Sequence, residues 1–330
     1  MKPPYRNFFA IASRVVHSRS TYEDIALRNR IVEISESPCR LRIQHRQLVI
    51  ERSAELDGLF PASIPLEDIA AVVVAHPQVS YTQHVLAELS EQGSVFITCN
   101  RERMPVGMLL PLSANSVQTE RFRRQLDLKL PQKKRLWQQI VKSKIDMQSR
   151  LLQEVHGETF GLPPLIPLVR SGDTTNVEAR AARRYWTALF GKDFRRDVEA
   201  ENQNRFLNYG YAILRAATAR AICAAGLHPS LGLHHHNKYN AWCLADDVME
   251  PFRPVVDKAV VQLVKTDGAD AEFTQARRAV LIRCLLSRVF VHEQQRTIFD
   301  ALSLVAASLV DALSGSEATL SLPQEFAHAA

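Results

Sequence analysis

The pattern of apolar and polar positions divides the chain near residue 114. Before this point, apolar residues come in short runs separated by turn residues. The runs at 41–43 and 48–50 flank His45 and Arg46, which predicts a hairpin. The run Ile-Ala-Ala-Val-Val-Val at 69–74 is long enough, and apolar enough, to predict a strand that is buried on both faces.

Three further elements are predicted in the same region. Ser80 can cap a helix that ends near residue 91. The segments 94–99 and 106–110 have the composition of strands. Residues 29–113 are therefore expected to form a small β-rich domain with one helix.

After residue 114, apolar residues recur with helical spacing. The charged region 116–155 is expected to be a helix interrupted at Pro131, and the segment after Gly315 is expected to be loose. Further helices are predicted over the segments 176–190, 202–225, 255–265, 273–289 and 293–313. The predicted fold class is α+β, in which the β-rich domain is followed by a larger all-helical C-terminal domain over 114–330.

Composition and charge favour a reduced compartment and an anionic partner. The 330 residues carry a net charge of +6, which favours nucleic acid. The basic residues 1–28 are expected to be a disordered extension or to touch anions. Five cysteines, an odd number with no C-x-x-C pair, fit a cytoplasmic protein. No apolar run approaches the roughly 18 residues that a membrane span needs.

Metal-binding residue types are concentrated between residues 233 and 254, where three consecutive histidines precede three acids. These residues are His234, His235, His236, Asp246, Asp247 and Glu250. Imidazole nitrogens and carboxylate oxygens both bind divalent metals. Pro251 and Pro254 lack the N–H groups that would continue the helix beside the acids, so its hydrogen bonding is expected to break there. The residues alone leave open a metal site and a His-rich loop entering a helix whose acids face water.

Two other features also have an ordinary structural explanation. Thr175-Asn-Val-Glu178 matches a capping box, in which the Glu178 carboxylate would satisfy the backbone N–H of Thr175. The region 116–155 carries a run of lysines and arginines, including Lys142 and Lys144. Such a run either covers a solvated helix face or follows a phosphate backbone.

Several long motifs occur in a fixed order along the chain. They are Ile64-Pro-Leu-Glu-Asp-Ile-Ala70, Lys134-Arg-Leu-Trp-Gln-Gln-Ile-Val-Lys-Ser-Lys-Ile145, Gly172-Asp-Thr-Thr-Asn-Val-Glu-Ala-Arg-Ala-Ala-Arg-Arg-Tyr-Trp186, Leu231-Gly-Leu-His-His235 and Asp246-Asp-Val-Met-Glu-Pro-Phe-Arg-Pro254. Together they resemble the CRISPR adaptation integrase family, the universal CRISPR-associated proteins that insert new spacers, and most of all the form found in type II systems. The resemblance covers residues 28–323. His236 stands where an arginine is common, and residues 1–28 have no counterpart.

The resemblance implies a ligand set. In this family one Glu, one His and one later acid bind a divalent cation, and these roles map onto Glu178, His235 and Glu250 as catalytic and metal-binding residues. Hard oxygen ligands with one imidazole suit Mg²⁺ or Mn²⁺ better than zinc. Asp247 is expected to support this set from just outside it, and His234 and His236 to orient the ligand or face DNA.

The resemblance also implies a metal-dependent DNA integrase and endonuclease. It would insert short foreign DNA fragments as new spacers into a CRISPR array, by attack of a 3′-hydroxyl on the repeat backbone. The helical domain would hold the site, and the β-rich domain would dimerise the protein. The expected partners are double-stranded DNA (fragment and repeat), a second copy of the chain, and a small ferredoxin-like CRISPR-associated protein that bridges two dimers.

Two other functions remain open at this point: a metal-dependent nuclease that acts on branched DNA in repair, and a non-catalytic DNA-binding scaffold. The basic residues that would contact DNA in any of the three are Arg121, Arg124, Lys133, Lys134, Arg135, Arg180, Arg184 and Arg253.

Overall fold

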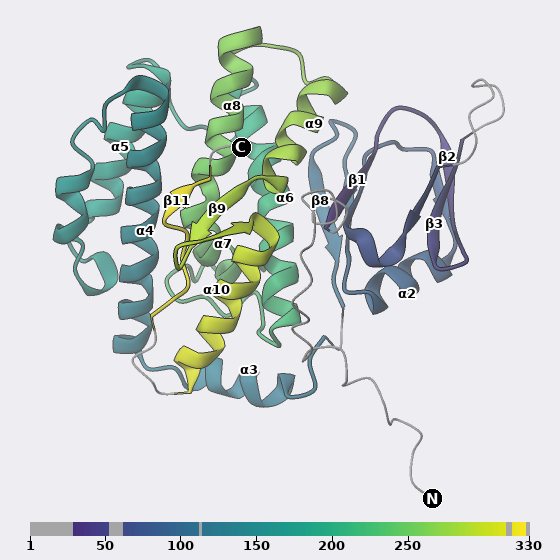
Figure 1. Cartoon of the computed structure of the whole chain (residues 1–330), viewed down its shortest axis with the longest axis horizontal. Coiled ribbons are helices and arrows are strands. Elements are labelled where there is room, and N and C mark those ends of the chain that lie inside the picture. Colours follow the sequence, from purple (N-terminus) through teal and green to yellow (C-terminus); the bar gives the residue numbers. More distant parts are fainter. Residues whose placement is uncertain (1–28, 53–61, 112–113, 315–318, 328–330) are drawn as a thin grey trace, which may run out of the picture.

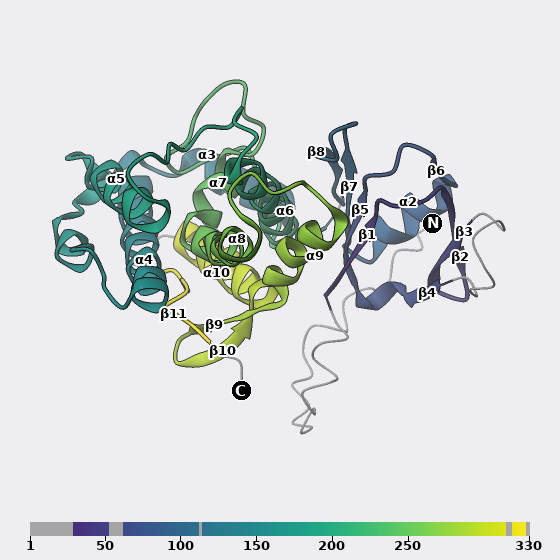
Figure 2. The same ribbon diagram turned by 90° about the horizontal axis from the view of Figure 1, so that it is seen from above.

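A strand-rich N-terminal part and a mostly helical C-terminal part lie side by side (Figure 1). The same division is visible from above (Figure 2). The structure is a computed structural model that describes residues 29–52, 62–111, 114–314 and 319–327. The expectations for residues 1–28 lie outside this described part. The fold is mixed α+β, with strands first and mostly helices afterwards.

A four-stranded sheet forms the face of the N-terminal part that packs against the helical part. Its strands, in spatial order, are β1 (Arg30–Ile34), β5 (Ile69–Val74), β7 (Val95–Cys99) and β8 (Pro105–Leu109). The first three are parallel, and β8 runs antiparallel to β7. All six residues of β5 are buried, which confirms the predicted buried strand. Because side chains alternate along it, Ala71 and Val73 pack against the helical part, whereas Val72 and Val74 pack against the second sheet.

The second sheet covers the outer face of the first. Its strands, in spatial order, are β4 (Ala62–Pro65), β3 (Gln47–Arg52), β2 (Cys39–Gln44) and β6 (Val79–Tyr81). The predicted hairpin between β2 and β3 is confirmed. Its two turn residues, His45 and Arg46, have positive φ of 50° and 58°, as the tight turn of a two-residue hairpin requires.

The N-terminal part also contains helix α2 (Gln83–Glu91) and the 3-10 turn η1 (Leu66–Asp68). The prediction that Ser80 caps the helix is wrong, because Ser80 pairs with Arg40 in the ladder between β6 and β2. The helix begins only after Thr82. The extended backbone demanded by strand pairing therefore displaced the start of the helix.

The helical part is organised around α6, which is mostly buried and contacts α7, α8, α9 and α10. Gly210 in α6 allows α8 to approach closely, since a Cβ at this position would lie 2.3 Å from Val256 Cγ1. The α-helices are α3 (Gln118–Asp127), α4 (Leu130–His156), α5 (Val177–Phe190), α6 (Gln203–Ala224), α7 (Cys243–Met249), α8 (Arg253–Asp267), α9 (Gln275–Arg283) and α10 (Ile298–Leu313). The 3-10 segments are η2 (Pro163–Leu168), η3 (Ser171–Asp173), η4 (Glu250–Phe252) and η5 (Cys284–Leu286).

The long helical region is interrupted just before Pro131 rather than at it. The break falls at Leu128 and Lys129, between α3 and α4. Pro131 then occupies the first turn of α4, where a missing N–H costs no helical hydrogen bond.

The expectation of an all-helical C-terminal domain is wrong. A small sheet in the order β10-β9-β11 is built from β9 (Arg288–Val291), β10 (Gln294–Thr297) and β11 (Glu325–Phe326). His292 and Glu293 turn the chain between β9 and β10 at positive φ, so the two helices predicted over 273–289 and 293–313 are both shorter. The segment expected to be loose is ordered from 319 to 327, where Leu320 and Phe326 are buried.

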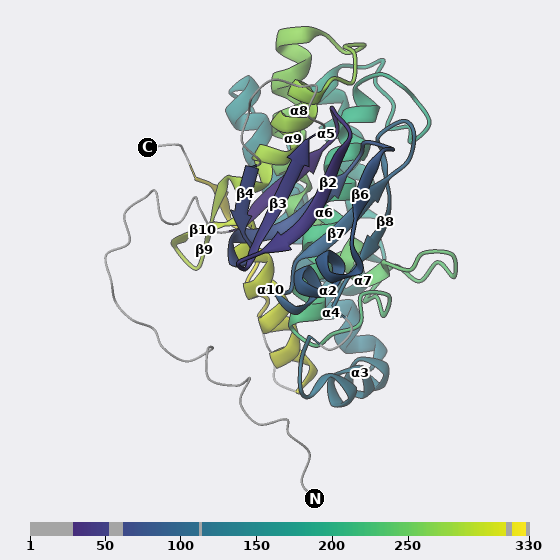
Figure 3. The ribbon, with the colours of Figure 1, turned by 90° about the vertical axis from the view of Figure 1, so that its right-hand side faces the viewer.

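The two parts are joined by buried polar contacts as well as apolar packing. Arg278 of α9 is fully buried, and its Nε donates to Oε1 of Glu33 in β1 at 2.6 Å. Arg220 Nε of α6 donates to the carbonyl of Gly93 at 2.6 Å. Figure 3 looks onto the sheets, with α6 and the other helices behind them. Across the described ranges, no helix has the length and apolar character to cross a membrane.

Candidate metal centre

The three acids predicted as a cluster lie on a helix that changes geometry among them. Helix α7 ends at Met249, Glu250 begins the 3-10 turn η4, and α8 starts at Arg253. The predicted break in helical hydrogen bonding is therefore confirmed. Asp246, Asp247 and Glu250 are all buried, so the acids do not face water.

Glu178 and Glu250 meet at a single cation, the ammonium group of Lys144. Nζ of Lys144, on α4, lies 2.5 Å from Glu178 Oε1 and 2.6 Å from Glu250 Oε2. The second oxygen of Glu250 pairs with Arg253 at 2.9 Å. Burial by itself would raise the pKa of Glu250, but the charges of Arg253 and Lys144 outweigh it and hold that pKa below its usual value.

His235 is fixed in position by Asp247, which is completely buried. Oδ2 of Asp247 accepts hydrogen bonds from the backbone N–H groups of Leu233 (2.6 Å) and His234 (3.0 Å). Its Oδ1 lies 2.6 Å from His235 Nδ1 and 3.2 Å from the His235 backbone nitrogen, which donates to it. In the neutral ring, an Nδ1–H that donates to Asp247 leaves the lone pair on Nε2, the nitrogen that can bind a metal.

Asp247 also changes how readily His235 takes up a proton. The hydrogen bond to Asp247 raises the pKa of His235 above its usual value, against the opposing effect of burial. The loop needs Gly232 to make these contacts, because a Cβ there would lie 2.3 Å from the His235 carbonyl oxygen and 3.0 Å from Asp247 Oδ2.

Trp137 of α4 supports the histidine loop from the other side. Its ring stacks on His234, with centroids 4.3 Å apart and an interplanar angle of 1°, and meets the edge of His235. His236 is exposed, and its Nδ1 lies 2.7 Å from the His234 carbonyl oxygen. His234 therefore packs against Trp137 with one face of its ring, while its side chain stays exposed.

The capping-box prediction for Glu178 is wrong. Asn176, in the left-handed conformation, precedes α5, and the carboxylate of Asp173 accepts the N–H groups of Val177 and Glu178 at 3.0 and 2.9 Å. Asp173 ends the turn η3, and the three residues between it and Val177 bring its carboxylate to the first N–H groups of the helix. The Glu178 side chain is thus released from backbone capping and points to Lys144.

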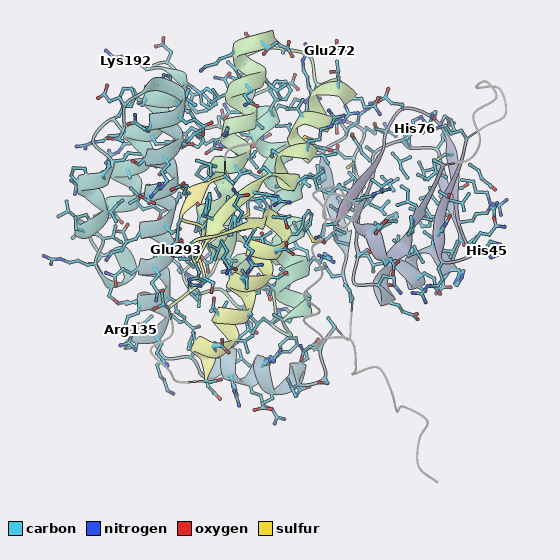
Figure 4. The ribbon with its side chains drawn as sticks, in the orientation of Figure 1. His45, His76, Arg135, Lys192, Glu272 and Glu293 are labelled. Atoms are coloured by element: carbon cyan, nitrogen blue, oxygen red, sulfur yellow. The ribbon has the colours of Figure 1, made fainter. Side chains whose placement is uncertain are left out.

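The residues predicted to bind DNA have different surroundings. Arg135 points outward from the lower end of α4 (Figure 4), and Lys133 and Lys134 are partly exposed beside it. Arg121 and Arg184 donate to the carbonyls of Ala225 and Gly161. The others are the exposed Arg180, Arg124, which pairs with Glu120, and Arg253, which pairs with Glu250.

Two hollows flank the histidine loop. One, of about 370 Å³, is lined by Trp137, Asp173, Glu178 and His234 among others. The second, of about 410 Å³, is lined by Lys133, His235 and neighbouring loop residues. A larger hollow of about 650 Å³ lies farther along the same loop and contains none of the three proposed ligands. Glu178 and His235 therefore border concave surfaces on the two sides of the loop, whereas Glu250 lines neither of these two hollows.

The residue types of the predicted ligands suit a divalent cation, but their side chains do not surround one common position. In the described part of the chain, no three His, Cys, Asp or Glu side chains are grouped closely enough to hold one metal ion. Glu250 Oε2 is buried, and Nζ of Lys144 lies 2.6 Å from it. Two carboxylates and one imidazole are suitable ligands for Mg²⁺ or Mn²⁺.

The family is decided by a sequence profile described as CRISPR associated protein Cas1, which matches residues 32–164 and 169–296. The chain belongs to the Cas1 family. The CRISPR-associated endonuclease Cas1 of Neisseria meningitidis serogroup C (strain 8013) is 35% identical over 288 residues, which cover 86% of this chain and 93% of that protein. The predicted membership and the likeness to the type II form are confirmed.

Solved structures share the fold of this Cas1-family chain. A casposase bound to integration product has a TM-score of 0.72 at 17% identity, and the match covers 87% of this chain and 91% of that one. A chain of a Cas6-RT-Cas1--Cas2 complex has a TM-score of 0.65 at 18% identity, over 87% of this chain and 35% of that one. At such identities these likenesses describe the fold.

Sequence reasoning missed three residues of the centre. In the sequence Lys144 is one member of a basic run, Asp173 is not distinguished as the cap of α5, and Trp137 occurs only within a family motif. Each acts on residues far from it in the sequence or through an unusual turn. The only local signal was Asp173 itself, an acid a few residues before a predicted helix start.

Proposed function

We propose that this Cas1-family protein is a metal-dependent DNA integrase and endonuclease that inserts short foreign DNA fragments as new spacers into a CRISPR array. The observation that carries the proposal is the meeting of Glu178 and Glu250 at one cation, beside a histidine whose ring is fixed by a buried acid. Family membership and the relative named as an endonuclease support it.

Glu178, Glu250 and Nε2 of His235 would hold one Mg²⁺ or Mn²⁺. When bound, such a cation polarises a scissile phosphate and stabilises the attacking 3′-hydroxyl and the leaving oxygen. Asp247 would keep the His235 ring turned so that Nε2 faces the ligand position. Arg253 would hold one oxygen of Glu250 and leave the other for the cation.

The DNA would be bound by charge rather than by sequence. The concave surfaces on either side of the histidine loop would admit its backbone, and the basic residues at the start of α4 would pair with phosphates. The β-rich part would join two copies of the chain. A small ferredoxin-like CRISPR-associated protein would bridge two such dimers, and the fold match to a chain of a complex whose title includes Cas1 and Cas2 supports a partner of this kind.

The test combines the purified protein and its small partner with a labelled short duplex, a supercoiled plasmid that carries the repeat, and Mn²⁺ or EDTA. We expect the label to become covalently attached at the repeat in Mn²⁺ only. A duplex with 3′-deoxy ends is the control, because it has no hydroxyl for the attack.

Each competing function gives a different product. A nuclease acting on branched DNA would nick or cleave without joining the label to the plasmid. A scaffold would bind DNA and leave both strands intact. Joining that persists in EDTA, or in a protein with Glu250→Ala, would refute the proposed mechanism.

A further inference from the structure

Lys144 is a charged group at the centre to which the proposed reaction gives no role. It projects from α4, and its side chain is only 12% exposed. Its ammonium nitrogen lies within 2.6 Å of both Glu178 and Glu250. Lys144 is therefore held between two acids on different helices and does not cover a solvated helix face.

We propose that Lys144 is an internal counter-ion that occupies the place of the divalent cation between Glu178 and Glu250 and competes with that cation for the two carboxylates. This inference rests on the metal site of the proposed function. It assigns Lys144 a positioning role: its charge holds the two acids near their working positions until the metal enters.

The distances make simultaneous occupancy unfavourable. The ammonium nitrogen is 2.5 and 2.6 Å from the two oxygens, and Mg²⁺ would need the same oxygens at about 2.0–2.1 Å. A metal that contacts both would therefore lie close to where Nζ now lies, and two like charges so near each other repel strongly in a buried setting. The lysine must move aside when the metal binds.

The surroundings explain why such a counter-ion is useful. Without it, the carboxylates of Glu178 and Glu250 would face each other, and the nearby Arg253 pairs with the other oxygen of Glu250. Burial would lower the pKa of Lys144, but Glu250 and Glu178 together raise it above its usual value, so the group remains a cation. Its flexible four-carbon stem allows it to withdraw without movement of α4.

Competition has a measurable consequence for binding. The metal must displace an existing ion pair, so the wild-type protein should bind Mn²⁺ more weakly than a variant in which residue 144 has no charge. The same variant should be less stable in the absence of metal, because its two acids are then uncompensated. Added Mn²⁺ should stabilise it more than the wild type.

The test measures Mn²⁺ binding to the full chain by isothermal titration calorimetry, together with the melting temperature in EDTA and in Mn²⁺. The test variant is Lys144→Met. Lys142→Met is the matched control, since it removes the same charge from the same helix. Lys144→Arg keeps the charge, and Lys144→Gln is the second neutral variant if Lys144→Met does not fold.

We expect the Kd for Mn²⁺ to fall by about threefold or more in the neutral variant, with a lower melting temperature in EDTA and a larger rise on adding Mn²⁺. Lys142→Met and Lys144→Arg should bind no more tightly than the wild type. A smaller fall, an unchanged Kd or weaker binding in the neutral variant overturns the competition.

The wild-type titration separates this inference from the proposed function. If the wild type binds Mn²⁺ through Glu178 and Glu250 but the neutral variant binds no more tightly, only the role of Lys144 is wrong. If neither protein shows Mn²⁺ binding that Glu178→Ala and Glu250→Ala abolish, the metal site is wrong and the inference falls with it.

Discussion

Replacement of Asp247 by asparagine should weaken the hydrogen bonds that hold the His235 ring and its loop in place. The volume of the side chain at position 247 would stay almost unchanged. The buried carboxylate accepts four hydrogen bonds, from three backbone N–H groups and from Nδ1 of His235. An asparagine has one acceptor oxygen, and its amide group carries hydrogens that would face donors. Either orientation of the amide is therefore unfavourable.

The two orientations have different costs. With its oxygen toward His235, the amide NH₂ faces the N–H groups of Leu233 and His234, which lose their acceptor. With its NH₂ toward His235, the amide favours the ring form that carries its proton on Nε2 and cannot bind a metal there. Hydrogen bonds to a charged group contribute about 1.5–3 kcal/mol each, so after local relaxation we expect a loss of about 2–4 kcal/mol in the free energy of unfolding.

The effect on metal binding should be of similar size. Loss of a residue that orients a metal-binding histidine typically weakens binding ~10–100-fold, which corresponds to about 1.4–2.7 kcal/mol. The assay is a Mn²⁺ titration by calorimetry, with the melting temperature measured in parallel. Nitrogen-15 NMR of the histidine rings would report which ring nitrogen carries the proton.

Asp246→Asn is the matched control. This neighbouring acid is also buried, but its oxygens pair with Arg215 at 2.6 Å and Asn240 at 2.7 Å and not with His235. It should lose stability and keep the histidine ring form of the wild type. Unchanged Mn²⁺ affinity and an unchanged ring form in Asp247→Asn would refute the orienting role of Asp247.

Three further predictions follow from the centre and from the basic face. Single alanine replacements of Glu178, His235 and Glu250 should each abolish strand transfer without unfolding the protein, and combined losses should be non-additive. The loss of activity in Asp247→Ala should be milder. Near-normal joining by Glu250→Ala would contradict the ligand set. Charge reversal of Lys133, Lys134 and Arg135 at the start of α4 should weaken binding to all duplexes alike. It should also flatten the dependence of log K on log salt by roughly one unit per lost phosphate contact. An unchanged slope would mean that these residues only solvate a helix. Asp247 raises the pKa of His235 above 6.5, so DNA joining at limiting Mn²⁺ should fall as pH drops through that raised pKa. More Mn²⁺ should partly restore the joining. An apparent pKa that does not move with metal concentration would argue against His235 as a ligand.

The same shift predicts the opposite trend for the stability of the metal-free protein. A group whose pKa is raised on folding stabilises the folded state at low pH, and this contribution is lost as pH rises through the raised value. His235→Gln should remove that part of the pH dependence. Thermal unfolding of both proteins in EDTA across this range would measure it.

Local pattern determined much of this protein. The buried strand at Ile69–Val74 could be predicted because a short apolar run rich in β-branched residues suits a strand that is covered on both faces. The hairpin at His45 and Arg46 and the break at Glu250 could be predicted because turn residues and prolines act on their immediate neighbours. Family motifs supplied the predicted ligand set, which spacing alone left open.

Where a local preference competed with distant partners, the sequence predicted the wrong structure. The predicted helices include residues 288–289 and 293–297, but pairing with β11, from the far end of the chain, and a turn at positive φ gave the strands β9 and β10 there. Thr175 and Glu178 match a capping box, but the carboxylate of Asp173 accepts the hydrogen bonds of the backbone N–H groups at this helix end.

Only the tertiary structure decided what Lys144 does. In the sequence it belongs to a run of basic residues on a long helix, and nothing in its neighbours distinguishes it from Lys142. Packing of α4 against α5 and η4 places its ammonium group between acids that are 34 and 106 positions away along the chain. The physical reason is that a buried charge is tolerated only beside opposite charges, and which charges are near is set by how helices pack and not by their order.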